Sequence, residues 1–216
     1  MLIKEIQLLA DDPDGTIQFY NEILGLKILS SDHTRISFSA GSSVLTFLRS
    51  EDTRPFYHFA FNIPWNQFEA AMDWVGSKLK LIEVTPGNAI ADFKSWNAKA
   101  FYFFDNNQNI VEMIARFDVD NASLQPFNGS SIYSVSEIGA VVESPMEYAQ
   151  ELNKKYQLEF FPKQKPANDF IAVGDDHGLF IIVPQNRKWY PTNIRSAKHW
   201  AKLTIEVSGK DVEITL

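Results

Sequence analysis

One acidic residue lies where an ionised side chain is costly. Glu112 stands between Val111 and Met113, inside an apolar run with the character of a buried strand. A buried carboxylate without a partner is unfavourable, so this side chain needs a partner beside it. We therefore predict that Glu112 is a ligand or the catalytic acid of a functional site.

The four histidines offer fewer candidates than their number suggests. His58 is followed by Phe59 and Phe61, and a single histidine in such a strand is more often a core residue than a ligand. The residues alone leave both interpretations of His58 open. His33 and His177 stand beside aspartates in predicted turns, where we expect them to be solvated.

The composition excludes several classes of function. The 216 residues include no cysteine, which rules out thiol catalysis and Cys-ligated zinc or Fe–S sites. The formal net charge is −7 and basic residues are scattered, which argues against a nucleic-acid or anionic-membrane partner. The sequence also lacks the GxSxG, P-loop, GxGxxG and HExxH motifs.

The elements that position Glu112 and His58 form a repeated unit. Residues 2–10 predict a strand, 13–24 a helix that ends at Gly25, and 26–29, 35–39 and 44–48 three further strands. This order of strand, helix and three strands defines unit one.

The same order returns along the chain. Unit two spans residues 57–114 and unit three spans 135–183, with Glu5-Ile6 of unit one matching Glu137-Ile138 of unit three at one offset. Unit four, 199–216, has no room for a helix. Since a repeat that cannot bury a sheet face alone must pair, we expect units one and two to pair with each other.

Two motifs resemble those of a known family. Residues 19–26 read FYNEILGL and residues 105–112 read DNNQNIVE. They are similar to the F-Y-x-x-x-L-G-L and D-P-x-G-N-x-x-E patterns of the vicinal oxygen chelate superfamily, which includes glyoxalase I, fosfomycin- and bleomycin-resistance proteins and extradiol dioxygenases. The resemblance implies an α+β fold in which βαβββ units form curved-sheet barrels, one complete and one incomplete.

The resemblance also implies a metal site. In that superfamily a divalent metal is held by the first strand of each paired unit and the last strand of the second. Motif matching assigns these positions to Glu5, His58 and Glu112, with Thr46 at the position of a further ligand in some members. Glu5 also admits the interpretation of a solvent-facing strand residue, and Gln7, on the same face, could replace it.

The implied ligand set differs from the two histidines and one carboxylate that suit Fe(II) in ring-cleaving dioxygenases. One histidine and two carboxylates favour Mn²⁺ or Mg²⁺, with Zn²⁺, Ni²⁺ and Fe as further candidates. The resemblance thus implies a metal-dependent lyase, isomerase, transferase or ring-cleaving type of enzyme acting on a small molecule in the N-terminal cup. The alternative is a metal-free protein of the bleomycin-resistance type that binds aromatic compounds.

Aromatic residues are candidates for the wall of that cup. Phe93, Trp96 and Tyr102 fall where superfamily members cover its mouth. Sheet cores are built of such residues too, so both interpretations stay open.

The repeats imply a domain division. We predict a complete glyoxalase-like domain over 1–117, a linker over 118–131, and a third unit with a truncated fourth over 132–216. Glu137, His199 and Glu213 echo the ligand set there, but we expect this part to be structural, forming a homodimer through unit three. With no targeting segment or membrane span in the sequence, the expected location is the cytoplasm.

Overall fold

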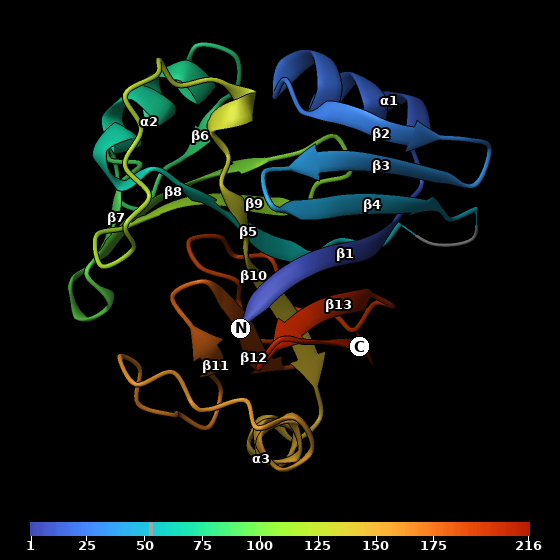
Figure 1. Ribbon diagram of the computed structural model, residues 1–216, viewed down its shortest axis with the longest axis vertical. Coiled ribbons are helices and arrows are strands. Elements are labelled where there is room, and N and C mark those ends of the chain that lie inside the picture. Colours follow the sequence, from blue (N-terminus) through green and yellow to red (C-terminus); the bar gives the residue numbers. More distant parts are fainter. Residues whose placement is uncertain (52–53) are drawn as a thin grey trace.

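The strands of the computed structural model, which describes residues 1–51 and 54–216, join into one curved mixed sheet with few helices (Figure 1). The fold class is therefore α+β, as the sequence predicts. The strands are β1 (Leu2–Ala10), β2 (Lys27–Ser31), β3 (Arg35–Ala40), β4 (Ser43–Arg49), β5 (His58–Ile63), β6 (Leu81–Ile82), β7 (Ala91–Phe93), β8 (Ala98–Phe104), β9 (Ile110–Arg116), β10 (Ser134–Val142), β11 (Ile171–Asp175), β12 (Gly178–Pro184), β13 (Lys202–Val207) and β14 (Lys210–Thr215).

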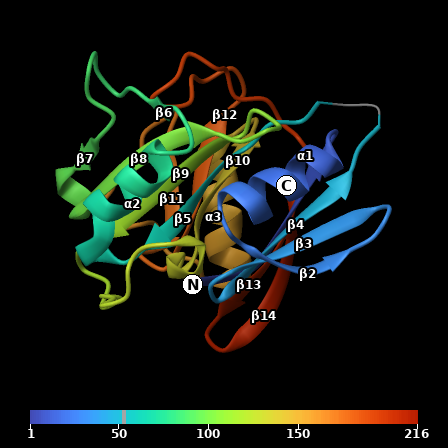
Figure 2. The same cartoon turned by 90° about the horizontal axis from the view of Figure 1, so that it is seen from above.

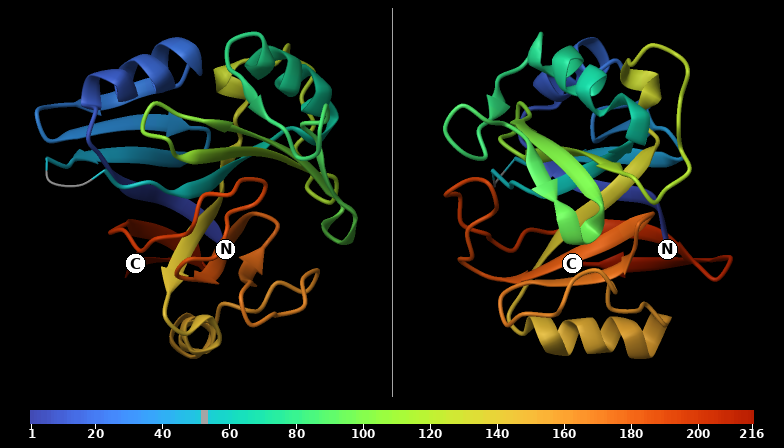
Figure 3. Two further views of the ribbon diagram at one scale, coloured as in Figure 1. Left: turned by 180° about the vertical axis from the view of Figure 1, so that it is seen from behind. Right: turned by 90° about the vertical axis from the view of Figure 1, so that its left-hand side faces the viewer.

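The helices lie on two sides of this sheet. They are α1 (Pro13–Ile17), continued by a π-helix (Gln18–Ile23), α2 (Phe68–Gly76) and α3 (Pro145–Tyr156), with short 3-10 turns at Trp65–Gln67, Lys94–Trp96 and Gly129–Ser131. From above, α1 and α2 lie over separate parts of the sheet (Figure 2). Side views place α3 on the opposite side (Figure 3). No helix in the described part of the chain has the length and apolar character needed to cross a membrane.

Local signals in the sequence explain where the first helix begins and ends. The Asp12 side chain accepts a hydrogen bond from the backbone of Gly15, and Pro13 occupies the first turn, where its missing N–H costs nothing. The helical segment ends before Gly25, whose φ of 67° lies in the left-handed region that glycine tolerates best.

Each of the first three units places its first and last strands side by side. In unit one β1 pairs in parallel with β4, in unit two β5 with β9, and in unit three β10 with β12. In unit three the strand that the repeated order predicts after the helix is reduced to an isolated bridge between Phe160 and Val173.

The pairing between units differs from the sequence prediction. Units one and two do not join through their first strands. Instead β5 of unit two lies antiparallel to β10 of unit three, and β1 of unit one lies antiparallel to β13 of unit four. The pair of units one and four joins the pair of units two and three where β1 lies beside β10, at Ile3 and Val135. A first strand has one free edge after pairing within its unit, and that edge here takes a strand from across the predicted linker.

Consequently the predicted division at 118–131 does not separate two independently paired parts. Strand β10 is bonded on both long edges within the chain, to β5 and β12. Unit three therefore needs no second copy of the chain to complete its sheet. The predicted homodimer stays a prediction.

Units one and two do contact each other through their two motifs. The Tyr20 hydroxyl of the first motif donates a 2.6 Å hydrogen bond to the buried Asp105 carboxylate of the second. Asp105 also accepts from the backbone N–H groups of Asn107 and Asn109, so it closes the β8–β9 turn. Both motifs thus have a structural role.

Candidate metal site and cavity

The register of three neighbouring strands brings two acidic side chains into one row. Glu112 of β9 pairs with Ala60 of β5, and Ala60 pairs on its other side with Glu137 of β10. Paired residues in neighbouring strands direct their side chains to the same face of a sheet. The small Ala60 side chain is therefore all that stands between the two carboxylates.

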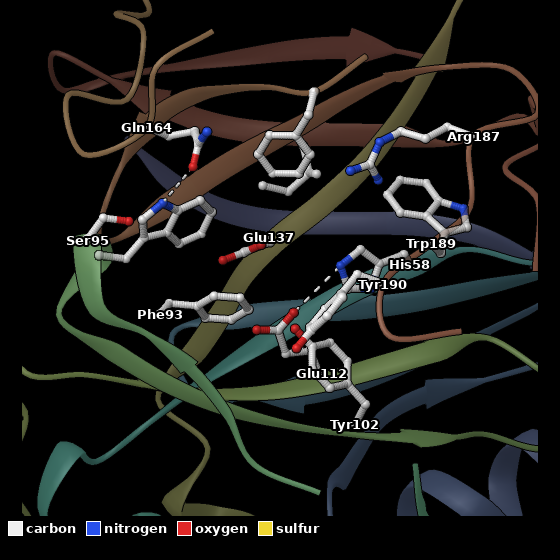
Figure 4. Close-up of a pocket in the computed structure, with 13 residues that line it drawn as sticks. His58, Phe93, Ser95, Tyr102, Glu112, Glu137, Gln164, Arg187, Trp189 and Tyr190 are labelled. Carbon is white, nitrogen blue, oxygen red and sulfur yellow. Dashed lines mark hydrogen bonds and ion pairs between the residues drawn. The ribbon is translucent and has the colours of Figure 1, made fainter. Parts of the chain in front are cut away.

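His58 completes the group because it lies two residues before Ala60 and shares its face. Ligand atoms of His58, Glu112 and Glu137 all lie within 4.8 Å of one another. His58 Nε2 is 3.6 Å from Glu112 Oε2, and all three residues are buried. Figure 4 shows the three side chains converging from β5, β9 and β10.

The second nitrogen of the His58 ring sets its orientation. Nδ1 lies 3.1 Å from the backbone carbonyl of Ile110, so in the neutral ring Nδ1–H donates there and Nε2 keeps a free lone pair. Burial lowers the pKa of His58 to about 4, and the positive charge of Arg187 acts in the same direction. The ring is therefore neutral near pH 7, the form that ligates metals.

The two carboxylates sit in environments that oppose their charge. Burial, reinforced by the negative charge of Glu137, raises the pKa of Glu112 well above its usual range. The positive charge of Arg116 and the hydroxyl of Tyr102, the partner of Glu112 in strand β8, oppose that rise. Such a pair is stabilised by a proton or by a cation between the two groups.

Glu137 has a buried cation behind it. Arg116, at the end of β9, forms an ion pair with Glu137 through Nη2, and it is 1% exposed. Burial raises the pKa of Glu137, while the Arg116 guanidinium lowers it. Arg116 Nη1 also lies 3.4 Å from Asp176, which pairs at 2.6 Å with Lys163. This chain of charges holds Glu137 in place.

A cavity of about 380 Å³ opens onto this group. Its lining residues are His58, Phe93, Ser95, Trp96, Tyr102, Glu112, Glu137, Gln164, Phe170, Ile181, Arg187, Trp189 and Tyr190. The volume falls in the range of small-molecule sites. The structure thus places the predicted wall residues Phe93, Trp96 and Tyr102 in one cavity with His58 and Glu112.

One wall of the cavity comes from a segment that the sequence analysis did not mark. Residues 185–201 connect β12 to β13 and contribute Arg187, Trp189 and Tyr190. The Trp189 ring can approach β10 because Gly139 has no side chain there, since an added Cβ would lie 2.6 Å from the ring. No motif marks this segment, although two adjacent aromatics beside an arginine in a long loop are a signal of binding.

The remaining predicted ligands lie elsewhere. Glu5 is not part of the group, because its carboxylate pairs with Arg35 at 2.6 Å and accepts a 2.6 Å hydrogen bond from Thr46. Gln7 donates to the same carboxylate at 3.1 Å. Glu137, which the sequence analysis noted as the counterpart of Glu5 and in the C-terminal echo of the ligand set, lies beside His58 and Glu112 instead.

The other residues of the C-terminal echo do not assemble a site with Glu137. The His199 ring packs edge-on against Phe56 and Tyr57, and Glu213 pairs with Lys202 at 2.9 Å. His33 and His177 are exposed, as predicted.

One imidazole and two carboxylates suit a divalent cation. Carboxylates are hard ligands, a neutral imidazole nitrogen binds transition metals and zinc, and a bound cation would offset the repulsion between the two glutamates. The buried donor set therefore fits the metal that the fold family implies.

Comparisons with known proteins identify the family. The model of the Glyoxalase/Bleomycin resistance protein/Dioxygenase superfamily matches residues 2–189. The chain belongs to this superfamily. A comparison with curated proteins finds no match in sequence.

Several solved structures are similar to this chain at low sequence identity. A proposed dioxygenase from Bacillus subtilis superposes with a TM-score of 0.60 at 16% identity, over 85% of this chain and 63% of that one. The chain thus spans less than two thirds of that protein. A glyoxalase/bleomycin resistance protein/dioxygenase from Alicyclobacillus acidocaldarius covers 54% of this chain and 92% of its own, with 17% identity and a TM-score of 0.45. The fosfomycin resistance protein FosX from Mesorhizobium loti covers 53% and 91%, with 14% identity and a TM-score of 0.39.

Proposed function

We propose that this protein is a metal-dependent enzyme that acts on a small molecule held in the cavity between units two and three. The observation that carries the proposal is the convergence of three buried donors, His58, Glu112 and Glu137, at the floor of a cavity of about 380 Å³. Two buried like charges at one point are costly unless a cation or a proton lies between them.

The proposed ligands are Nε2 of His58 and carboxylate oxygens of Glu112 and Glu137. Glu137 replaces Glu5, whose carboxylate is already paired with Arg35. The donor set favours Mn²⁺ or Mg²⁺, with Fe, Zn²⁺ and Ni²⁺ as alternatives. A bound divalent cation would supply Lewis acidity toward substrate oxygens.

The residues around the donors have separate roles in this proposal. Glu112 is also the catalytic acid–base candidate, because burial beside Glu137 raises its pKa well above its usual range. Tyr102 holds the Glu112 carboxylate through its hydroxyl. Arg116 fixes Glu137, and the aromatic walls exclude water and orient the substrate.

Equivalent glutamates provide a matched test of the site. Metal content of protein purified without chelator is measured by elemental analysis for the unchanged chain, Glu137→Gln, Glu5→Gln and His58→Ala. We expect close to one divalent ion per chain, lost in Glu137→Gln and His58→Ala and retained in Glu5→Gln.

The outcome separates the proposal from its alternatives. Loss of metal in Glu5→Gln with retention in Glu137→Gln would return the site to unit one. Absence of metal from the unchanged chain, also after incubation with Mn²⁺, would contradict the enzyme proposal and favour a metal-free binding protein. Unfolding curves for each variant show whether a loss reflects the site or the fold.

A further inference from the structure

The cavity contains a cation that the proposed metal site does not use. Among the described residues that line it, Arg187 is the one with a permanent positive charge. Figure 4 shows its guanidinium directed into the cavity beside Trp189.

The contacts of Arg187 leave much of its hydrogen-bonding capacity free. Nε lies 3.4 Å from a carboxylate oxygen of Asp169, whose side chain is 65% exposed, so this pair is long and weak. Nη1 donates to the backbone carbonyl of Lys188 at 3.1 Å. Within the described part of the chain, Nη2 has no hydrogen-bond partner, although the side chain is only 23% exposed.

Arginine in this position is held rather than free to swing away. Its guanidinium stacks at 5.0 Å from the ring centre of Phe170, another residue of the cavity wall. The backbone of Arg187 accepts a hydrogen bond from Ser196, which closes the 185–201 segment into a hairpin-like loop. A cation fixed by stacking and by its loop is preorganised for an anion.

The charge balance of the cavity points the same way. Glu112 and Glu137 carry two negative charges that a divalent cation at their donors would offset. The charge of Arg116, behind Glu137, is offset by Asp176. Arg187 is then the cation of the cavity wall whose own partner, Asp169, is distant and largely exposed, and a loaded cavity favours a ligand of negative charge.

The walls define the shape of that ligand. Phe93 lies between Trp96 and Tyr190, with ring centres 5.6 and 6.1 Å away, and Tyr190 lies 5.9 Å from Tyr102. On the other side Trp189 is 5.1 Å from the His58 ring. Flat rings on facing walls suit a planar, conjugated body.

We propose that the substrate of this cavity is a planar aromatic acid whose carboxylate is bound by Arg187. This inference rests on the proposed function, because it takes the cavity as the substrate site. Arg187 is a binding residue in this proposal and has no role in holding the metal.

Two ligands of matched shape test the proposal. Cinnamate and cinnamamide share their planar body and differ in charge, and each is titrated calorimetrically into Mn²⁺-treated protein. We compare the unchanged chain with Arg187→Gln, and with Arg195→Gln as control, because Arg195 lies on the same loop, is exposed and does not line the cavity.

A charge-assisted contact of this kind corresponds to about 10- to 100-fold in affinity. We expect Arg187→Gln to weaken cinnamate binding by that factor and cinnamamide binding by less than about twofold, with Arg195→Gln changing neither. Equal weakening of both ligands, an equal effect of Arg195→Gln, or no binding of cinnamate at millimolar concentration would overturn the proposal.

Metal content of the same samples separates this inference from the proposed function. Normal metal content with no preference for cinnamate defeats the inference alone. Absence of metal with an Arg187-dependent preference for cinnamate defeats the enzyme proposal and leaves anion recognition standing. Direct binding of the carboxylate to the metal would persist in Arg187→Gln and is thereby distinguished from binding to Arg187.

Discussion

Replacing Arg116 with methionine removes the cation behind Glu137 while keeping an apolar side chain of similar length. Arg116 is 1% exposed and packs with its guanidinium 5.5 Å from the Trp96 ring centre, so methionine can fill much of the space. Asp176, its second partner, keeps Lys163 at 2.6 Å. The change therefore acts first on Glu137, which loses its ion pair, and also removes the long Arg116 contacts with Ser136 Oγ at 3.3 and 3.4 Å.

The expected cost follows from burial. Glu137 is 2% exposed, and breaking a buried ion pair by removing one partner costs about 3–5 kcal/mol. Because Arg116 lowers the pKa of Glu137 against burial, its removal raises that pKa further. Each unit of rise is worth about 1.4 kcal/mol, and a protonated Glu137 must release its proton to bind a metal. Metal affinity near pH 7 should fall together with stability.

Urea unfolding followed by circular dichroism measures the free energy of unfolding. Arg35→Met is the control, since Arg35 pairs with Glu5 at 2.6 Å but its side chain is 41% exposed, and we expect a loss below about 1 kcal/mol. In the double variant Arg116→Met/Glu137→Gln we expect more than half of the lost stability to return. A loss below about 1 kcal/mol in Arg116→Met, or no recovery in the double variant, would refute this account of the pair.

Two further predictions concern the row of paired residues and the motif contact. Ala60→Leu should abolish metal binding without removing a donor, because the leucine side chain enters the space between Glu112 and Glu137. Elemental analysis together with an unfolding curve checks this. Full metal content in a folded variant would contradict it. Burial raises the pKa of Asp105 from 3.8 to about 6. The protonated Asp105 therefore contributes stability that is fully present below pH 4 and is lost as the pH rises through 6. The corresponding fall in the free energy of unfolding is about 3 kcal/mol. The difference in unfolding free energy between the unchanged chain and Asp105→Asn should therefore shift by that amount between pH 4 and 7, and a difference independent of pH would be evidence against a buried, perturbed carboxylate.

Features that depend only on residues within one unit could be predicted from the sequence. The spacing of apolar residues, the Pro13 start and the Gly25 stop of the first helix indicated the order of strand, helix and three strands in unit one. The unfavourable placement of Glu112 in an apolar strand marked it as a residue that needs a partner, and Tyr102 and Glu137 lie beside it.

The partners between units could not be predicted, because any first strand can offer its free edge to any other. The hydrophobic pattern fixes which face of β5 is buried, but it does not say whether β1 or β10 lies alongside. The nearest complete unit in the chain is therefore a natural prediction, and the strand pairing differs from it. The register shift between Val135 and Glu137 that sets Glu137 opposite Ala60 has no sequence signal either.

The two halves of the sheet show how this choice decides the site. Glu5 pairs with Thr204, and Thr204 pairs with Glu213, just as Glu137 pairs with Ala60 and Ala60 with Glu112. Both rows thus contain two carboxylates with a small residue between them.

The rows differ in the cations that their neighbours supply. Two residues before Thr204 stands Lys202, at the position that His58 has before Ala60, and it pairs with Glu213 at 2.9 Å while Arg35 pairs with Glu5. Each carboxylate of that row has its own cation from the chain. In the other row Arg116 forms its ion pair with Glu137, and Glu112 faces a neutral imidazole. The row of Glu112 and Glu137 thus has one cation fewer and is buried under aromatic walls, and for this reason we propose it as the metal site. This physical difference separates Glu137 from Glu5 despite their equivalent places in the repeat.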